Sequence, residues 1–142
     1  MKHAGICILL ITILFFSLHC TQDDDPKKLR KSDYLIITDF NTPDIKKLKS
    51  NPYKEEELEE VALFSLKNNK YTTRTPEIRR ISENVLEYHI TDIGLENPRV
   101  WAEHACTRFV KKNGFWYVEW AGKVWKCTKN KNAKWHKRKC TD

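Results

Sequence analysis

Residues 99–127 constrain the fold of this 142-residue chain more than any other part of the sequence. They form two runs of aromatic and apolar residues separated by Asn113-Gly114. This dipeptide tolerates the positive φ angles of a type I′ turn, so the pattern predicts a β-hairpin with a two-residue loop. An unbroken antiparallel register from that loop would place Arg108 directly opposite Glu119.

That register assigns each side chain of the hairpin to one of two faces, both largely apolar. We therefore expect each face to be covered by a helix, by the curl of the sheet or by a ligand. The tryptophans are predicted to pack in the core and across strands, with a groove lined by Trp101, Trp116 or Trp125 as the alternative. The first face would carry Phe109, Val118, Thr107, Trp120, Ala105, Gly122, Val124 and Trp101, and the second Val110, Tyr117, Cys106, Ala121, Ala102, Trp125, Val100 and Cys127.

The chain before the hairpin has weaker signals. A proline and early acidic residues precede helically spaced apolar positions, which predicts an amphipathic helix over residues 53–68. Alternation develops between residues 77 and 93 and predicts the first strand of the sheet. Residues 71–76 are predicted to be a loop or a short edge strand. The apolar run 34–37 fits a strand or a helix, and turn residues follow it at 41–43.

This order of elements predicts an α+β fold, with one amphipathic helix packed on a curved antiparallel sheet of about three to four strands. Residues 34–142 would form a single domain with a basic C-terminal tail. The run 85–127, which ends in FWYVEWAGKVWKC, resembles the closing strands of small secreted domains of the cystatin-like or NTF2-like type. The resemblance implies a conical sheet that can enclose a pocket, and it carries over no catalytic residues.

The N-terminus predicts export. A short polar start and an apolar run over residues 6–18 are typical of a secretory signal peptide, assigned to residues 1–19. Residues 17–20, Ser-Leu-His-Cys, resemble a relaxed lipobox of spirochaete lipoproteins. The resemblance implies a lipid on Cys20 that holds the protein to a membrane of the cell envelope. A flexible tether would span residues 20–33. The alternative is an ordinary signal peptide and a soluble secreted protein.

The net charge of +7 comes from the C-terminal tail. Residues 122–142 carry eight Lys or Arg against one acidic residue. Basic and aromatic residues together predict contact with an anionic glycan, a lipid headgroup or an acidic protein, with a solvated surface as the alternative. Nucleic acid is not expected outside the cytoplasm. The candidate anion-binding residues are Lys126, Lys129, Lys131, Lys134, Lys137, Arg138 and Lys139.

The cysteines predict a disulfide in an oxidising envelope. Cys127 with Cys140 would tie the tail to the last strand and leave Cys106 as a buried thiol. Cys106 with Cys140 is the alternative, which requires the tail to fold back over the sheet.

Candidate metal and catalytic residues do not form a recognisable motif. His104, Cys106, Cys127, His136 and Cys140 are zinc-binding residue types, but they contain no C-x2-C pair, and lysines surround His136. Cys106 with His104 or His89 as base has no visible third group. The chain is too small and too poor in glycine for a sugar cleft, which argues against Glu87, Glu103 and Glu119 as a glycosidase pair.

We therefore predict no metal, no cofactor and no catalytic residues. The expected function is a non-catalytic interaction or ligand-binding module anchored in the cell envelope. Two alternatives remain: a secreted soluble factor that acts through the basic tail, and an NTF2-like enzyme with a pocket behind the sheet.

Overall fold

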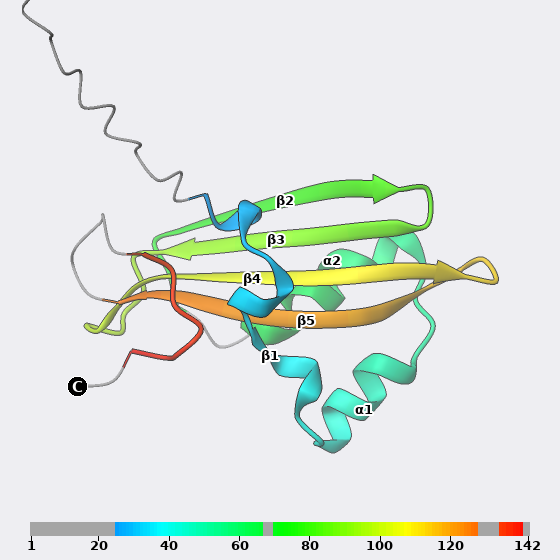
Figure 1. The fold of residues 1–142 in the computed structure, drawn as a ribbon, viewed down its shortest axis with the longest axis horizontal. Helices are drawn as coiled ribbons and strands as arrows, with labels where there is room; N and C mark the ends of the chain where they lie inside the picture. The colour runs from blue at the N-terminus through cyan, green and yellow to red at the C-terminus, as the bar shows by residue number, and fades with distance from the viewer. Residues whose placement is uncertain (1–24, 67–69, 128–133, 141–142) are drawn as a thin grey trace, which may run out of the picture.

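The computed structural model describes residues 25–66, 70–127 and 134–140, and it contains a five-stranded antiparallel sheet (Figure 1). The strands lie in the spatial order β1-β5-β4-β3-β2. Their bounds are β1 Leu35–Ile36, β2 Thr73–Ser82, β3 Val85–Ile93, β4 Val100–Lys112 and β5 Phe115–Cys127. The predicted α+β class is confirmed, and the sheet has five strands where three to four were expected.

The two outer strands account for this difference. β1 is only two residues long and pairs with β5, so it carries no detectable periodicity. β2 is an edge strand whose side chains are mostly exposed, and it includes Pro76. A proline weakens a strand prediction, but an edge strand tolerates it because one side of its backbone has no partner.

Helix α1 (Pro43–Ser50) was not predicted. Residues 41–43 were expected to form a turn, but Thr42 is the N-cap of this helix and Pro43 is its first residue. The Thr42 hydroxyl accepts a hydrogen bond from the Ile45 backbone N–H at 3.3 Å, and Pro43 occupies the first turn. Both features are favourable at a helix N-terminus. Ile45 and Leu48 face the core.

Helix α2 (Leu58–Ala62) is shorter than the helix predicted over residues 53–68. Tyr53 does not begin a helix, because its backbone forms an isolated β-bridge with Trp116, with N–O distances of 2.8 and 2.9 Å. Two 3₁₀ turns flank α2: η4 Glu55–Glu57 and η5 Leu63–Leu66. Residues 67 and 68 lie outside the described ranges.

The β4–β5 hairpin has the predicted turn but not the predicted register. Asn113 and Gly114 both have positive φ angles, 52° and 83°. Pairing is regular from the turn as far as Phe109 with Val118, and then a β-bulge places Arg108 opposite Trp120 instead of Glu119. A second shift, between Val100 and Ala102, restores the pairing of Val100 with Cys127.

The bulge changes the faces assigned to residues 120–125 of β5, because each one-residue slip exchanges the two sides of a strand. Ala121 packs with Phe109 in the core beneath the helices. Trp120 and Val124 pack with Cys106 on the opposite face. The predicted separation of Trp120 from Cys106 is therefore wrong.

Each face of the sheet has a hydrophobic core. The larger core lies between the sheet and the two α-helices; in Figure 1, α2 appears behind the strands and α1 lies below β5. The smaller one lies on the opposite face. Buried residues of the larger core are Ile45, Leu48, Leu58, Ala62, Leu66, Leu86, Tyr88, Ile90, Ala105, Phe109, Trp116, Val118 and Ala121. Those of the smaller core are Tyr34, Cys106, Trp120 and Val124.

The N-terminal segment, residues 25–33 of the predicted tether, packs on the second face of the sheet. It crosses in front of the strands in Figure 1. Lys27 Nζ lies 2.7 Å from Glu77 Oε2 of β2, and Leu29 packs against the smaller core. This segment has only one strongly apolar side chain, so its own pattern did not indicate packing. Its turns are η1 Pro26–Lys28 and η2 Lys31–Asp33.

The predicted signal peptide and Cys20 lie outside the described residues. Within the described ranges, none of the helices has the length and apolar character that a membrane span requires.

Candidate functional site

The C-terminal segment 134–140 is attached to the end of β5 at two points. A disulfide joins Cys127 to Cys140, with an S–S distance of 2.09 Å, as the sequence predicted. The alternative partner, Cys106, is a free and buried thiol. His136 and Trp125 form an isolated antiparallel bridge with two N–O distances of 2.8 Å.

Several predicted anion-binding residues gather on this segment. Lys137, Arg138 and Lys139 line a shallow hollow of about 420 Å³ together with His136 and the disulfide. The residues that line the hollow include no acidic side chain, so its potential is positive. The side chains of Lys134, Lys137, Arg138 and Lys139 are all exposed.

The remaining candidates of this group differ in position. Lys126 is half-buried, and its ammonium lies 5.1 Å from the centre of the Trp135 ring. It therefore contributes to packing of the segment as well as to its charge. Lys129 and Lys131 lie outside the described residues.

A second hollow, of about 430 Å³, lies near the ends of β4 and β5. An ion pair contributes to its lining, with Lys123 Nζ 2.7 Å from Glu103 Oε1. Phe40 at its edge is 52 % exposed. The other lining residues are Leu35, Ile37, Leu95, Asn97, Val100, Trp125 and Lys139.

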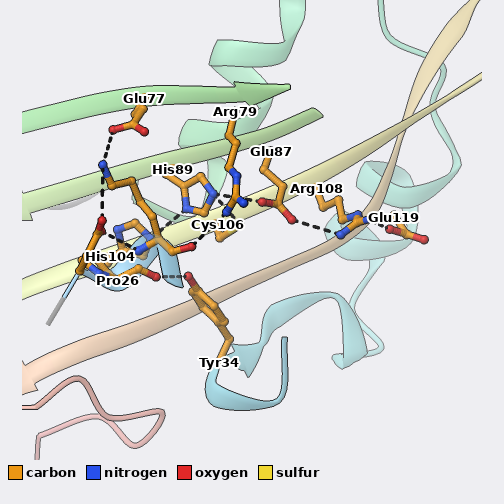
Figure 2. A network of polar contacts seen from close by, with 12 residues as sticks. Pro26, Tyr34, Glu77, Arg79, Glu87, His89, His104, Cys106, Arg108 and Glu119 are labelled. Carbon is orange, nitrogen blue, oxygen red and sulfur yellow. Dashed lines mark hydrogen bonds and ion pairs between the residues drawn. The ribbon is translucent and has the colours of Figure 1, made fainter. Parts of the chain in front are cut away.

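A chain of polar side chains crosses β3 and β4 beneath the N-terminal segment (Figure 2). Arg108 Nη1 lies 3.2 Å from Glu87 Oε1, and Glu87 Oε2 lies 3.3 Å from His89 Nε2. His89 Nδ1 lies 3.2 Å from His104 Nε2. His104 Nδ1 lies 2.8 Å from Thr91 Oγ1. Glu87, His89 and His104 are buried.

One arrangement of protons satisfies the whole chain. A carboxylate only accepts hydrogen bonds, so His89 Nε2 donates to Glu87 and His89 Nδ1 accepts from His104 Nε2. The Thr91 hydroxyl then donates to His104 Nδ1. Burial is the main cause that lowers the pKa of His104 to about 3, and the charge of Lys27 and that of His89 when it is protonated act in the same direction. Burial also lowers the pKa of His89, although Glu87 acts in the opposite direction. Both rings are neutral at pH 7.

Cys106 lies beside this chain but is not an activated nucleophile. Its sulfur is 3.9 Å from His89 Nε2, the nitrogen that carries a proton in the arrangement above. Burial, and then the negative charge of Glu87, raises the pKa of the Cys106 thiol. A thiol without an adjacent base stays protonated and weakly nucleophilic.

The zinc ligands considered from the sequence do not form one site. Cys127 and Cys140 are joined in the disulfide, and His136 lies in the segment attached to β5. The structure brings together a different set, Glu87, His89 and Cys106, whose ligand atoms lie within 4.8 Å of one another.

The three glutamates considered as candidates for a pair of catalytic carboxylates belong to two different ion-pair networks. Glu87 and Glu119 both contact Arg108, with Glu119 Oε2 3.0 Å from Arg108 Nε. Glu103 contacts Lys123 in the second hollow. A guanidinium between two carboxylates forms an ion-pair network, so these residues do not have the arrangement of a hydrolytic acid and base.

The sequence contains part of the signal for the buried cluster. Alternation in β3 predicts that residues 87, 89 and 91 share one side of the strand. Their meeting with Cys106 and His104 depends on the β3–β4 register, which pairs His89 with Cys106 and Thr91 with His104. The sequence indicates a register only for the β4–β5 hairpin, so it does not reveal the cluster.

No protein-family model, no curated protein and no solved structure matches this chain. The class of this protein is therefore described from its fold and its sites. It is a small α+β domain whose antiparallel sheet is covered on both faces, with a basic hollow at one end and a buried Glu-His-Cys cluster on the second face.

Proposed function

We propose that this protein is a non-catalytic binding module of the cell envelope, anchored through a lipid on Cys20. Its basic C-terminal segment binds the anionic groups of a lipid headgroup, a glycan or an acidic protein. The observation that carries this proposal is the attachment of segment 134–140 to β5, which holds Lys137, Arg138 and Lys139 around one hollow.

The attachment of segment 134–140 to β5 supports binding because it lowers the conformational entropy that the segment loses when it binds a partner. A free basic tail must lose conformational entropy when it binds, and this loss reduces its affinity. A disulfide and a backbone bridge have already restricted residues 134–140 in this protein. Like charges held close together also produce a stronger local potential than the same charges spread over a mobile chain.

Vesicle binding tests the proposal. Vesicles of an anionic phospholipid should bind the delipidated protein, vesicles of a zwitterionic phospholipid should not, and the affinity should fall steeply with salt. The triple variant Lys137→Gln, Arg138→Gln and Lys139→Gln should bind at least about tenfold more weakly, given about 1 kcal/mol per basic residue near such a surface. A sulfated polysaccharide and an acidic polypeptide, tested in parallel, distinguish the other two partners.

A matched control removes three exposed lysines of α1 by the changes Lys46→Gln, Lys47→Gln and Lys49→Gln. It lowers the net charge by the same amount and should bind nearly as the wild type does. Equal weakening by both triple variants would mean that only total charge matters, and the proposed site would be rejected.

The lipid anchor has a separate test. Cys20→Ala should move the protein from the detergent-rich to the aqueous phase, and the intact mass of the wild type should include acyl chains. An unmodified mass in the soluble fraction would favour the alternative of a secreted factor.

The second hollow favours one further candidate, a small-molecule site near the ends of β4 and β5. Its apolar wall and the Glu103–Lys123 ion pair suit a ligand with an apolar body and a polar group. Such a ligand should change the fluorescence of Trp125, and Phe40→Asp should abolish the effect. An unchanged response in that variant would exclude this hollow.

A further inference from the structure

Three side chains of metal-binding type meet in the middle of the buried chain on β3 and β4. Their ligand atoms are Glu87 Oε2, His89 Nε2 and Cys106 Sγ. His89 Nε2 lies 3.3 Å from the carboxylate oxygen and 3.9 Å from the sulfur, and all three atoms lie within 4.8 Å of one another. A tetrahedral zinc ion with bonds of about 2.0–2.3 Å separates its ligand atoms by about 3.3–3.8 Å. We propose that Glu87, His89 and Cys106 form a zinc-binding site.

The sheet backbone holds the three ligands in place. Glu87 and His89 are two residues apart on β3 and therefore share a face. Cys106 is the direct partner of His89 across the β3–β4 ladder. All three side chains are buried. Ligands on adjacent, hydrogen-bonded strands are better preorganised than ligands on loops.

The charges of the ion and its three ligands balance. A zinc ion bound by one carboxylate, one thiolate and a neutral imidazole has no net charge, and Cys106 releases its proton as the zinc–sulfur bond forms. Arg108 contacts the other carboxylate oxygen, Glu87 Oε1, and leaves Oε2 for the metal. The positive charge of Arg108 is in turn compensated by Glu119, 3.0 Å away.

The second nitrogen of His89 already has a buried partner. Ligating histidines almost always donate their other N–H to a neighbouring acceptor. Once zinc occupies His89 Nε2, the proton of that ring resides on Nδ1 and is donated to His104 Nε2, 3.2 Å away. His104 then donates from Nδ1 to Thr91 Oγ1, 2.8 Å away. Each ring keeps one proton, so the hydrogen-bond chain reverses direction without breaking.

A cavity lies beside the histidine end of the cluster. A cavity of about 250 Å³ has His89 and His104 in its wall, and Pro26, Lys27 and Trp135 border it. The three protein ligands leave one tetrahedral position, which a water molecule would occupy.

The test uses the disulfide-intact mature chain, stripped with a chelator and then given zinc or cobalt. Native mass spectrometry should count one zinc per chain, and cobalt should produce a thiolate-to-metal charge-transfer band in the near ultraviolet. Cys106→Ser should abolish this band and weaken zinc binding at least about 100-fold. His104→Asn should keep the band and weaken binding by about 10–100-fold, the usual effect of losing a partner of a ligating histidine.

Two control variants lie outside the cluster. Cys20→Ser and His136→Gln should bind zinc as the wild type does. Because Cys127 and Cys140 are joined, a thiolate band that survives Cys20→Ser assigns the sulfur ligand to Cys106 even if Cys106→Ser fails to fold. The proposal is overturned if the wild type binds no zinc, if Cys106→Ser keeps the band, or if His136→Gln loses the metal.

Discussion

His104 and Asp92 show how burial changes the behaviour of single residues. Neither has exposed surface, although both are ionisable. Asp92 is paired with Arg74, whose Nε and Nη2 lie 2.6 and 2.7 Å from its two oxygens. His104 instead remains neutral between His89 and Thr91. One residue is buried with its charge compensated, and the other is buried without a charge.

The stability of the metal-free protein should decrease as pH falls from about 6.5 toward 3. The unfolded His104 takes up a proton near its ordinary pKa of 6.5, whereas the folded one does so only near 3, so acid favours unfolding. This one group contributes up to about 1.4 kcal/mol per pH unit within the window. Denaturant unfolding at several pH values with a chelator present measures the slope. His104→Gln should flatten it and His136→Gln should not, and an unchanged slope in His104→Gln would contradict the assignment.

Arg74→Met should lower the free energy of unfolding by about 3 kcal/mol, because it removes the guanidinium from a buried carboxylate. Arg80→Met is the matched control on the same strand. Its ion pair with Glu55 is exposed, so its loss should cost less than about 1 kcal/mol. Chemical denaturation compares the two, and equal effects would show that burial of Asp92 does not matter.

At the scale of elements, two segments far apart in the sequence attach to β5 of the β4–β5 hairpin: β1 and the C-terminal segment. β1 pairs with β5 at Gly122. An added Cβ at this glycine would lie 2.8 Å from Tyr34 Cβ and 3.1 Å from the Leu35 carbonyl oxygen. The close approach of β1 therefore depends on the missing side chain. At the other end of β5, the disulfide attaches the C-terminal segment.

Gly122→Ala should destabilise the protein by about 1–3 kcal/mol, the usual cost of overpacking, by forcing β1 away from β5. Hydrogen exchange should show faster exchange of the backbone amides that join these two strands. Gly114→Asn is the control in the same hairpin, since nothing lies within 4 Å of its added Cβ and asparagine tolerates positive φ. A Gly122→Ala protein as stable as the control would show that β1 can shift without cost.

Removing the disulfide by Cys127→Ser and Cys140→Ser should lower the free energy of unfolding by about 3 kcal/mol, from the loop-entropy estimate for cysteines separated by 13 positions. It should also weaken binding to anionic vesicles, because segment 134–140 loses one of its two attachments. Reduction of the wild type should reproduce both effects. Unchanged vesicle binding would mean that the disulfide does not organise the basic hollow.

At the scale of the whole molecule, segments from both ends of the described chain cover the second face of the sheet. Leu29 comes from the N-terminal segment and Trp135 from the C-terminal one, and both pack against the smaller core. Cys106 lies beneath them and is 1 % exposed. The helices cover only the first face, so the buried cluster depends on these two segments.

A chain that begins at Tyr34 should therefore expose Cys106 to thiol reagents. We expect its alkylation rate to rise at least about tenfold over that of a chain that begins at Asp25, because local opening controls access to a buried thiol. Circular dichroism checks that both chains keep the sheet. Equal alkylation rates would show that residues 25–33 do not shield the cluster.

The sequence by itself determined the local features of this protein. The Asn113-Gly114 turn and the α+β class follow from residue types and spacing, because turn conformation and periodicity are local properties of the chain. The sequence left two pairings open for Cys140, and the structure joins it to Cys127. The start of α1 at Thr42 and Pro43 was also encoded locally, but the same residues favour turns, and only the packing of Ile45 and Leu48 decided for a helix.

Only the tertiary structure decided the features that depend on register and on distant contacts. The β-bulge between Arg108 and Phe109 has no local signature, and it exchanged the faces of half of β5. The covering of the second face by residues 25–33, and the meeting of His89 with Cys106 that forms the proposed zinc site, depend on which strands pair and in what alignment. Strand pairing joins residues far apart in the sequence, so its energy is not visible in any single stretch of the chain.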